Sequence, residues 1–134
     1  MSAADSTLDL PRLLDTAGSI LDAAVDRFVD GQGAPSAINK GGTDFATQVD
    51  LDLERHIGAE LADRTQIPVH GEEFGGADVV DGPVWVLDPI DGTFNFLKGI
   101  PCWGVVAAYV IDGRTLLGLT YDPVHDELFT AATR

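Results

Sequence analysis

The sequence predicts an α+β domain in which two N-terminal helices pack on one face of an antiparallel sheet. Apolar residues recur at helical spacing in the N-terminal half, and short β-rich runs follow Gln66. An Asp-Gly pair also separates two of the later apolar runs, which is a strong hairpin signal. Helices that precede a series of strands are typical of this fold class.

The first helix is predicted from Leu8 to Val29. Its apolar side chains recur every three or four positions and form one face: Leu10, Leu13, Leu14, Ala17, Ile20, Leu21, Ala24, Val25 and Phe28. Two glycines and Pro35 then end the pattern, and the polar stretch up to Thr43 is interpreted as a loop or a hairpin.

The second helix is predicted from Asp50 to Asp63. Thr47 precedes Asp50 by three positions, which is the spacing of a helix cap, and Leu53, Ile57 and Leu61 form one stripe. After it, apolar runs predict the strands Ile67–His70, Val84–Leu87, Trp103–Ile111, Arg114–Tyr121 and Glu127–Ala132. The aromatic side chains of Trp85, Phe94, Phe96 and Trp103 are expected in the core.

Charge excludes several classes of partner. The 134 residues contain eight Lys plus Arg against 22 Asp plus Glu, a net charge of −14. Such a chain is repelled by nucleic acid and by anionic membranes, because both are bound through basic side chains. We find no signal peptide and no run of ~18 apolar residues, so we expect no membrane span and a cytoplasmic location. The single cysteine, Cys102, agrees with a reducing compartment.

The segment Asp88-Pro-Ile-Asp-Gly-Thr93 is the strongest candidate site. Asp88 is predicted to end a strand, so that a turn brings Asp88 and Asp91 together and leaves the Ile90 carbonyl unpaired. Oxygen ligands of this kind suit Mg²⁺ or Mn²⁺. Gly92 and Thr93 would open a short helix whose N–H groups attract an anion. The alternative is an ordinary Pro-Asp-Gly turn.

A second acidic pair, Glu72-Glu73, also follows a predicted strand. If the two strands are neighbours, four carboxylates crowd together, and bound metal would relieve their repulsion. Two unrelated solvated loops are the alternative. Asp50, at the start of the second helix, is either part of its cap or a group that orients a hydroxyl or a water for attack.

These motifs, in this order, resemble the inositol monophosphatase family of magnesium-dependent, lithium-sensitive sugar phosphatases. Lys40, Asp44-Phe-Ala-Thr47 and Gly99-Ile-Pro101 extend the likeness, which runs from about Leu8 to Arg134. The segment from Val69 to Gly76 most resembles actinobacterial members.

The resemblance implies a role for each site residue. The metal ligands would be Glu72, Asp88, the Ile90 carbonyl and Asp91, with Glu73 just behind them. Thr93, hydrogen-bonded to Asp50, would help Glu72 and the metal to activate water. The phosphate would contact the backbone of Gly92 and Thr93, and Lys40 would add positive charge.

The resemblance also implies that residues 1–134 are the N-terminal, metal-binding domain and the first half of an α/β/α/β/α sandwich. Family members continue into a second half that contains a Trp-Asp motif, whose aspartate completes the metal site. We expect a phosphomonoesterase for a small phosphorylated polyol such as inositol 1-phosphate, with histidinol phosphate, fructose 1,6-bisphosphate and 3′-phosphoadenosine 5′-phosphate as alternatives. The competing expectation is a truncated, non-catalytic metal-binding fragment, or a half-enzyme that functions only when complemented. Partners would be a second copy, as in family homodimers, or association through the exposed truncated face.

Overall fold

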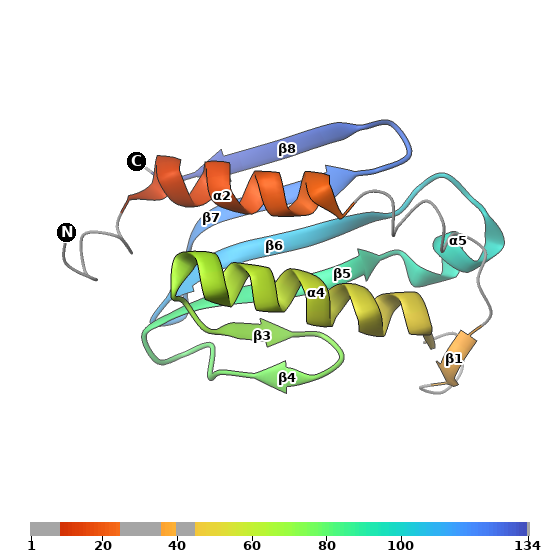
Figure 1. Cartoon of the computed structure of the whole chain (residues 1–134), viewed down its shortest axis with the longest axis horizontal. Helices are drawn as coiled ribbons and strands as arrows, with labels where there is room; N and C mark the ends of the chain where they lie inside the picture. Colours follow the sequence, from red (N-terminus) through yellow and green to blue (C-terminus); the bar gives the residue numbers. More distant parts are fainter. Residues whose placement is uncertain (1–8, 25–35, 40–44, 134) are drawn as a thin grey trace.

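A six-stranded sheet forms the centre of the molecule, in the order β4-β3-β5-β6-β7-β8. The computed structural model describes residues 9–24, 36–39 and 45–133. Helices α2 (Leu10–Ala23) and α4 (Gln48–Thr65) lie side by side on one face of the sheet (Figure 1). The predicted α+β class, with two helices on one face of a mostly antiparallel sheet, is therefore confirmed.

Helix α2 begins directly after a capping residue. Asp9 is the N-cap, and its carboxylate accepts the Arg12 N–H at 3.2 Å. Its buried face consists of Leu13, Ala17, Ile20 and Leu21, as the spacing predicted. The described helix ends at Ala23, and the predicted continuation to Val29 and the following turn fall in residues 25–35, outside the described part.

Helix α4 buries Leu53, Ile57 and Leu61, as predicted, and it is slightly longer than expected at both ends. Its buried stripe also contains two acids, Asp50 and Glu54, which are 0% and 4% exposed. Before it, β1 (Ser36–Asn39) and β2 (Phe45–Thr47) pair antiparallel, so the hairpin interpretation of this segment was the correct one.

The strands after α4 follow the predicted runs with two differences. Strands β3 (Val69–Gly71) and β5 (Pro83–Asp91) are parallel neighbours, and β4 (Gly75–Gly76) adds a two-residue edge. Strands β6 (Gly104–Ile111), β7 (Arg114–Asp122) and β8 (Glu127–Ala132) continue the sheet antiparallel. Asp112 and Gly113 both have positive φ, as the predicted Asp-Gly hairpin requires.

The core lies between the helices and the sheet. Trp85 and Phe96 are fully buried and Trp103 nearly so, as expected, whereas Phe94 is 47% exposed. It lies on the outer side of the short helix α5 (Thr93–Lys98), where Lys98 Nζ is 5.8 Å from its ring centre. The prediction for Phe94 is therefore wrong, because a helix of six residues buries only one side.

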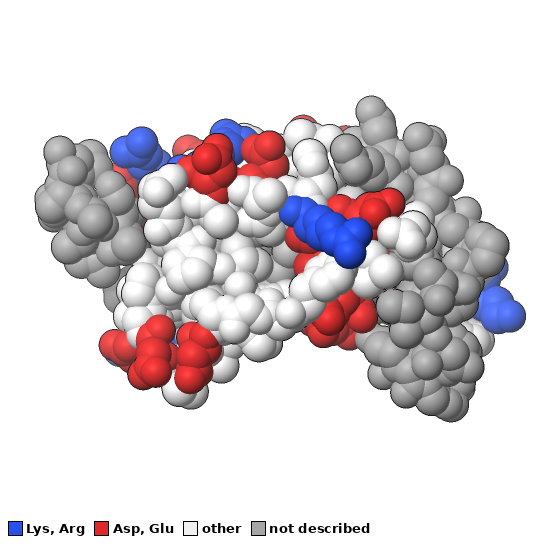
Figure 2. Space-filling view, turned by 60° about the horizontal axis from the view of Figure 1, so that its bottom comes forward, with Lys and Arg blue, Asp and Glu red and all other residues white. Residues whose placement is uncertain are grey.

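Acidic side chains outnumber basic ones on the face drawn in Figure 2, in agreement with the net charge. In Figure 2 they gather in patches around a broad uncharged area, and Lys and Arg are few. In the part of the chain that the structure describes, no helix is both long and apolar enough to cross a membrane.

Candidate active site

The site is built around the C-terminal end of β5. This strand runs through the Asp88-Pro-Ile-Asp91 segment, so the prediction that Asp88 ends the strand is wrong. Pairing with β6 shifts register between Asp88 and Asp91. The irregularity admits Pro89, which has no N–H to give to a regular ladder. The predicted turn is thus an irregular strand end that projects two carboxylates.

Gly92 allows the chain to turn from β5 into α5. It has φ of 90° and ψ of 42°, the left-handed conformation, and caps the helix that begins at Thr93. A Cβ at this position would lie 3.1 Å from the Cys102 carbonyl oxygen. Both the positive φ and the close backbone favour glycine. The predicted short helix after the acidic segment is confirmed.

Thr93 connects α5 to α4. Its Oγ1 lies 3.3 Å from Asp50 Oδ1 and 3.1 Å from the Ile90 carbonyl oxygen. A hydroxyl has one hydrogen, so it donates to one of these acceptors at a time. The Ile90 carbonyl, predicted to be unpaired, therefore has Thr93 as a donor, and this part of the prediction is corrected.

Glu72 and Asp88 are hydrogen-bonded carboxyl groups at the ends of two adjacent strands. Because β3 and β5 are parallel and Gly71 pairs with Leu87, the next residues on each strand are neighbours. Burial, a hydrogen bond to Glu72 and the charges of Glu72 and Asp91 raise the pKa of Asp88 from 3.8 to about 8. Asp88 thus interacts with both Glu72 and Asp91.

Not every predicted residue joins this cluster. Within residues 9–24, 36–39 and 45–133, no three His, Cys, Asp or Glu side chains are arranged so that together they could hold a metal ion. Lys40 lies outside the described residues. The metal-ligand set Glu72, Asp88, Ile90 and Asp91, and the place of Glu73 behind it, stay predictions.

The chemistry of the donors nevertheless fits a hard divalent cation. Asp88 Oδ1 is buried without a hydrogen-bond partner. A buried carboxylate oxygen without a donor is costly, and a neighbouring acid adds to the cost. Oxygen ligands of this kind are those that Mg²⁺ prefers. A cation at the Glu72–Asp88 pair would supply the missing positive charge.

One buried acid was missed by the sequence reasoning. Glu54 accepts the backbone N–H groups of Glu73 and Phe74, each at 2.7 Å. The available signal was its helical spacing: Glu54 follows Asp50 by four positions and precedes Ile57 by three, so it belongs to the buried stripe of α4.

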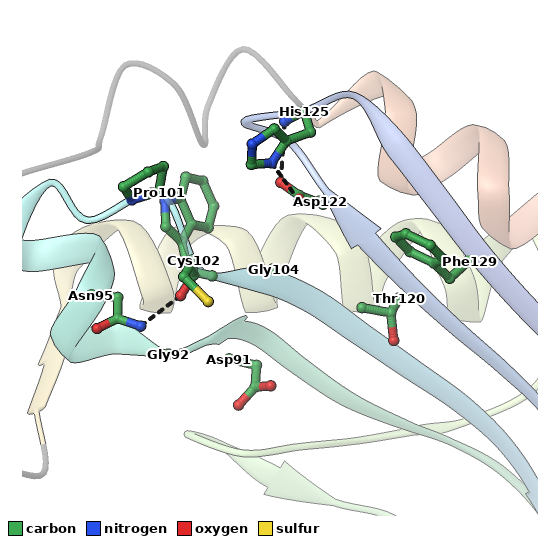
Figure 3. A pocket seen from close by; sticks show the side chains of 11 residues that line it. Asp91, Gly92, Asn95, Pro101, Cys102, Gly104, Thr120, Asp122, His125 and Phe129 are labelled. Atoms are coloured by element: carbon green, nitrogen blue, oxygen red, sulfur yellow. Dashed lines mark hydrogen bonds and ion pairs between the residues drawn. The ribbon is translucent and has the colours of Figure 1, made fainter.

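A cavity of about 520 Å³ opens beside Asp91 and Gly92. Figure 3 shows Asp91 and the pair Asp122–His125 on different sides of it. Asp122 Oδ2 and His125 Nδ1 are 2.8 Å apart. Burial alone raises the pKa of Asp122, but hydrogen bonds from His125 and Val124 outweigh it and hold that pKa below its ordinary value. The cavity provides space next to the acidic strand end.

Helices on one face of a mixed sheet, with carboxylates at the ends of two adjacent strands and a Gly-Thr helix start beside them, are typical of the metal-dependent sugar phosphatases. The chain belongs to the inositol monophosphatase family, whose sequence profile matches residues 10–134.

Individual relatives agree with this assignment. Inositol-1-monophosphatase ImpA of Mycolicibacterium smegmatis is 48% identical over 122 residues, which are 91% of this chain and 44% of that protein. The extragenic suppressor protein suhB of Bartonella henselae has a similar structure, with a TM-score of 0.80 and 30% identity over 90% of this chain and 48% of that one. Inositol monophosphatase-II of Staphylococcus aureus gives a TM-score of 0.74 and 30% identity, covering 91% and 46%. The chain thus spans less than half the length of these relatives.

Proposed function

We propose that the chain is the metal-binding domain, residues 1–134, of a Mg²⁺-dependent phosphomonoesterase that hydrolyses a small phosphorylated polyol. The observation that carries the proposal is the Glu72–Asp88 pair with its buried, unpartnered Asp88 Oδ1. The pair lies at the strand end that leads through Asp91 into Gly92 and Thr93.

Each residue would have a separate task. Glu72, Asp88, the Ile90 carbonyl and Asp91 would hold Mg²⁺, or Mn²⁺ in its place. When bound, such an ion lowers the pKa of water and neutralises phosphoryl oxygens. Thr93, whose hydroxyl is within reach of Asp50, would position the attacking water, with Glu72 close by. The N–H groups of Gly92 and Thr93 would bind the phosphate, and Glu73 would support the ligands from behind.

Inositol 1-phosphate is the leading substrate. A solved structure of SaIMPase-II, 30% identical to this chain, carries inositol monophosphate, and another carries 2′AMP. The second ligand shows that this relative accommodates more than one phosphate monoester. Histidinol phosphate, fructose 1,6-bisphosphate and 3′-phosphoadenosine 5′-phosphate therefore stay as alternatives.

The second candidate is a metal-binding half-site without catalysis. It is favoured by the lack of a three-ligand cluster among the described residues and by the 44% coverage of ImpA. In that case the activity needs further ligands and a substrate wall that residues 1–134 do not supply.

One assay separates the two candidates. Phosphate release from inositol 1-phosphate is measured with and without Mg²⁺ for the purified chain and for Asp91→Asn, and Mn²⁺ binding is measured by calorimetry. Mg²⁺-dependent release that Asp91→Asn loses supports the enzyme. Metal binding without release supports the half-site, and absence of both rejects a metal site in this chain.

A further inference from the structure

The geometry points to Glu54 as a positioning residue that holds the loop with Glu72 and Glu73 in its metal-binding shape. This inference rests on the proposed function, because it concerns the same acidic site. Glu54 lies on α4, whereas the loop follows β3. The side chain of Glu54 contacts the backbone of this loop, which is distant from it in sequence.

The carboxylate of Glu54 is buried, and both of its oxygens accept hydrogen bonds. It is 4% exposed, and its two oxygens accept separate N–H groups: Oε1 that of Glu73 and Oε2 that of Phe74, both at 2.7 Å. These are short, charge-assisted hydrogen bonds, stronger than bonds between neutral groups. Two consecutive amides bound to one carboxylate fix the direction of the backbone directly after Glu72.

Two further contacts confine the same loop. A Cβ at Gly71 would overlap the Glu54 carboxyl group, so glycine leaves room for the carboxylate in its present position. On the other side, the Arg55 guanidinium carbon lies 4.6 Å from the ring centre of Phe74. Adjacent residues of α4 thus hold both ends of the short segment that contains Glu73.

Within the described residues, the hydrogen bonds of the Glu54 carboxylate go to the backbone amides of Glu73 and Phe74, so we argue that its effect on the site passes through the loop. Residues behind a metal site orient its ligands, and their loss typically lowers metal affinity about 10- to 100-fold. If Glu54 fixes the position of Glu72, replacing Glu54 weakens the binding of a divalent cation without changing any of its ligands.

Three variants test this. Glu54→Gln keeps the size but replaces one accepting oxygen by an NH₂ donor that faces an N–H group. Gly71→Ala keeps the charge of Glu54 and displaces its carboxylate, which separates geometry from electrostatics. Gly118→Ala on β7 is the matched control, because a Cβ there meets nothing within 4 Å. The readouts are amide hydrogen exchange and calorimetric Mn²⁺ affinity, at a temperature where circular dichroism shows each variant folded.

We expect Glu54→Gln and Gly71→Ala to lower the protection of the Glu73 and Phe74 amides and to weaken Mn²⁺ binding about 10-fold or more. The Glu72 amide, which donates to the Leu87 carbonyl at 3.0 Å, should keep its protection and serves as the internal reference. Gly118→Ala should leave all values unchanged. If Glu54→Gln does not fold, Gly71→Ala carries the same test.

Wild-type Mn²⁺ affinity retained in both variants would overturn the positioning role while leaving the proposed function intact. Unchanged protection of Glu73 and Phe74 would overturn the anchoring itself. A wild-type chain that binds no Mn²⁺ would reject the proposed function, and the loop would then have no metal to be positioned for.

Discussion

Thr93 Oγ1 lies 3.3 Å from Asp50 Oδ1, although the two residues are 43 positions apart. This contact joins the start of α5 to the first turn of α4. The same helix reaches the β3 loop through Glu54. Two acids on the buried stripe of α4 therefore connect both loops of the candidate site to one rigid element, which is how sequence-distant motifs come to share a fixed geometry.

The Thr93 hydroxyl should contribute measurably to stability. Thr93→Val keeps the shape but removes the donor shared by Asp50 and the Ile90 carbonyl. We expect the free energy of unfolding to fall by about 1–3 kcal/mol, the usual cost of removing a donor from buried acceptors. Urea unfolding measures it. Thr93→Ser, which keeps the hydroxyl, should lose about 1 kcal/mol or less, and equal losses in the two variants would contradict this role.

Much of the fold followed from periodicity. The apolar spacing predicted the buried faces of α2 and α4, and the Asp-Gly pair predicted the β6–β7 hairpin, because both are local properties of the chain. Strand β4 was missed since Gly75 and Gly76 have no apolar pattern. The end of β5 was placed too early because Pro89 signals a strand end unless pairing is irregular.

The candidate site was predicted only in part. Motif order pointed to Glu72, Asp88 and Asp91, and the parallel pairing of β3 with β5 explains why they interact. Parallel pairing is a tertiary property without a short sequence signal. Glu54 escaped notice for a different reason: a charged residue on a helix is normally solvated, and its burial depends on amides supplied by a loop far along the chain.

Gly92→Ala should destabilise the chain more than the same change in an open turn. Gly92 has a positive φ and little room beside the Cys102 carbonyl. Gly113 also has a positive φ, but a Cβ there meets nothing within 4 Å. Left-handed strain costs roughly 1–2 kcal/mol at either position, and only Gly92→Ala adds the steric contact. Urea unfolding of both variants measures the difference, and identical losses would show that the contact is relieved without cost.

Tyr121 should make stability fall at alkaline pH. Its hydroxyl donates to Asp126 at 2.7 Å and lies 3.5 Å from Asp22 on α2. Burial, the hydrogen bond to Asp126 and the nearby negative charges raise the pKa of Tyr121 above 10.0. A raised pKa favours the neutral form in the folded state, so this contribution is complete below pH 10 and declines as pH rises above it.

Comparison with Tyr121→Phe isolates this effect. The variant lacks the titrating hydroxyl, so the difference in unfolding free energy between wild type and variant should be largest near neutral pH and shrink between pH 10 and pH 11. Guanidinium unfolding at each pH measures it. A difference that does not change with pH would exclude Tyr121 as the source of any alkaline loss.

The Asp122–His125 pair should make the stability of the folded chain depend on pH in the acidic range. The hydrogen bonds from His125 and Val124 hold the pKa of Asp122 below 3.8 despite its burial. A lowered pKa stabilises the folded state above pH 3.8, and this contribution is lost as pH falls through the folded value. His125→Ala should move the pKa of Asp122 upward, as measured by carboxyl NMR titration. His56→Ala on α4 serves as the control and should leave that pKa unchanged.

Asp88→Asn should stabilise the metal-free chain and abolish its response to Mg²⁺. Burial and the neighbouring acids raise the pKa of Asp88 to about 8, so folding above pH 3.8 requires this carboxyl to take up a proton, and stability falls as pH rises from 3.8 to about 8. The amide is neutral in both states and removes this cost. It also removes the oxygen pair expected to hold the cation. In the wild-type chain, Mg²⁺ at about 100 times its dissociation constant should add about 2.7 kcal/mol of stability, whereas the variant should gain nothing.

Thermal unfolding with 0 and with saturating Mg²⁺, followed by EDTA, measures both effects in one series. Asp112→Asn, in the β6–β7 turn, is the matched control, because it changes the same functional group outside the acidic site. The two parts of the prediction are independent. If metal-free Asp88→Asn is less stable than the metal-free wild-type chain, the Asp88 carboxyl must make stabilising interactions that asparagine cannot replace. A variant that still gains stability from Mg²⁺ would place the cation away from Asp88, whose Oδ1 is buried without a hydrogen-bond partner among the described residues.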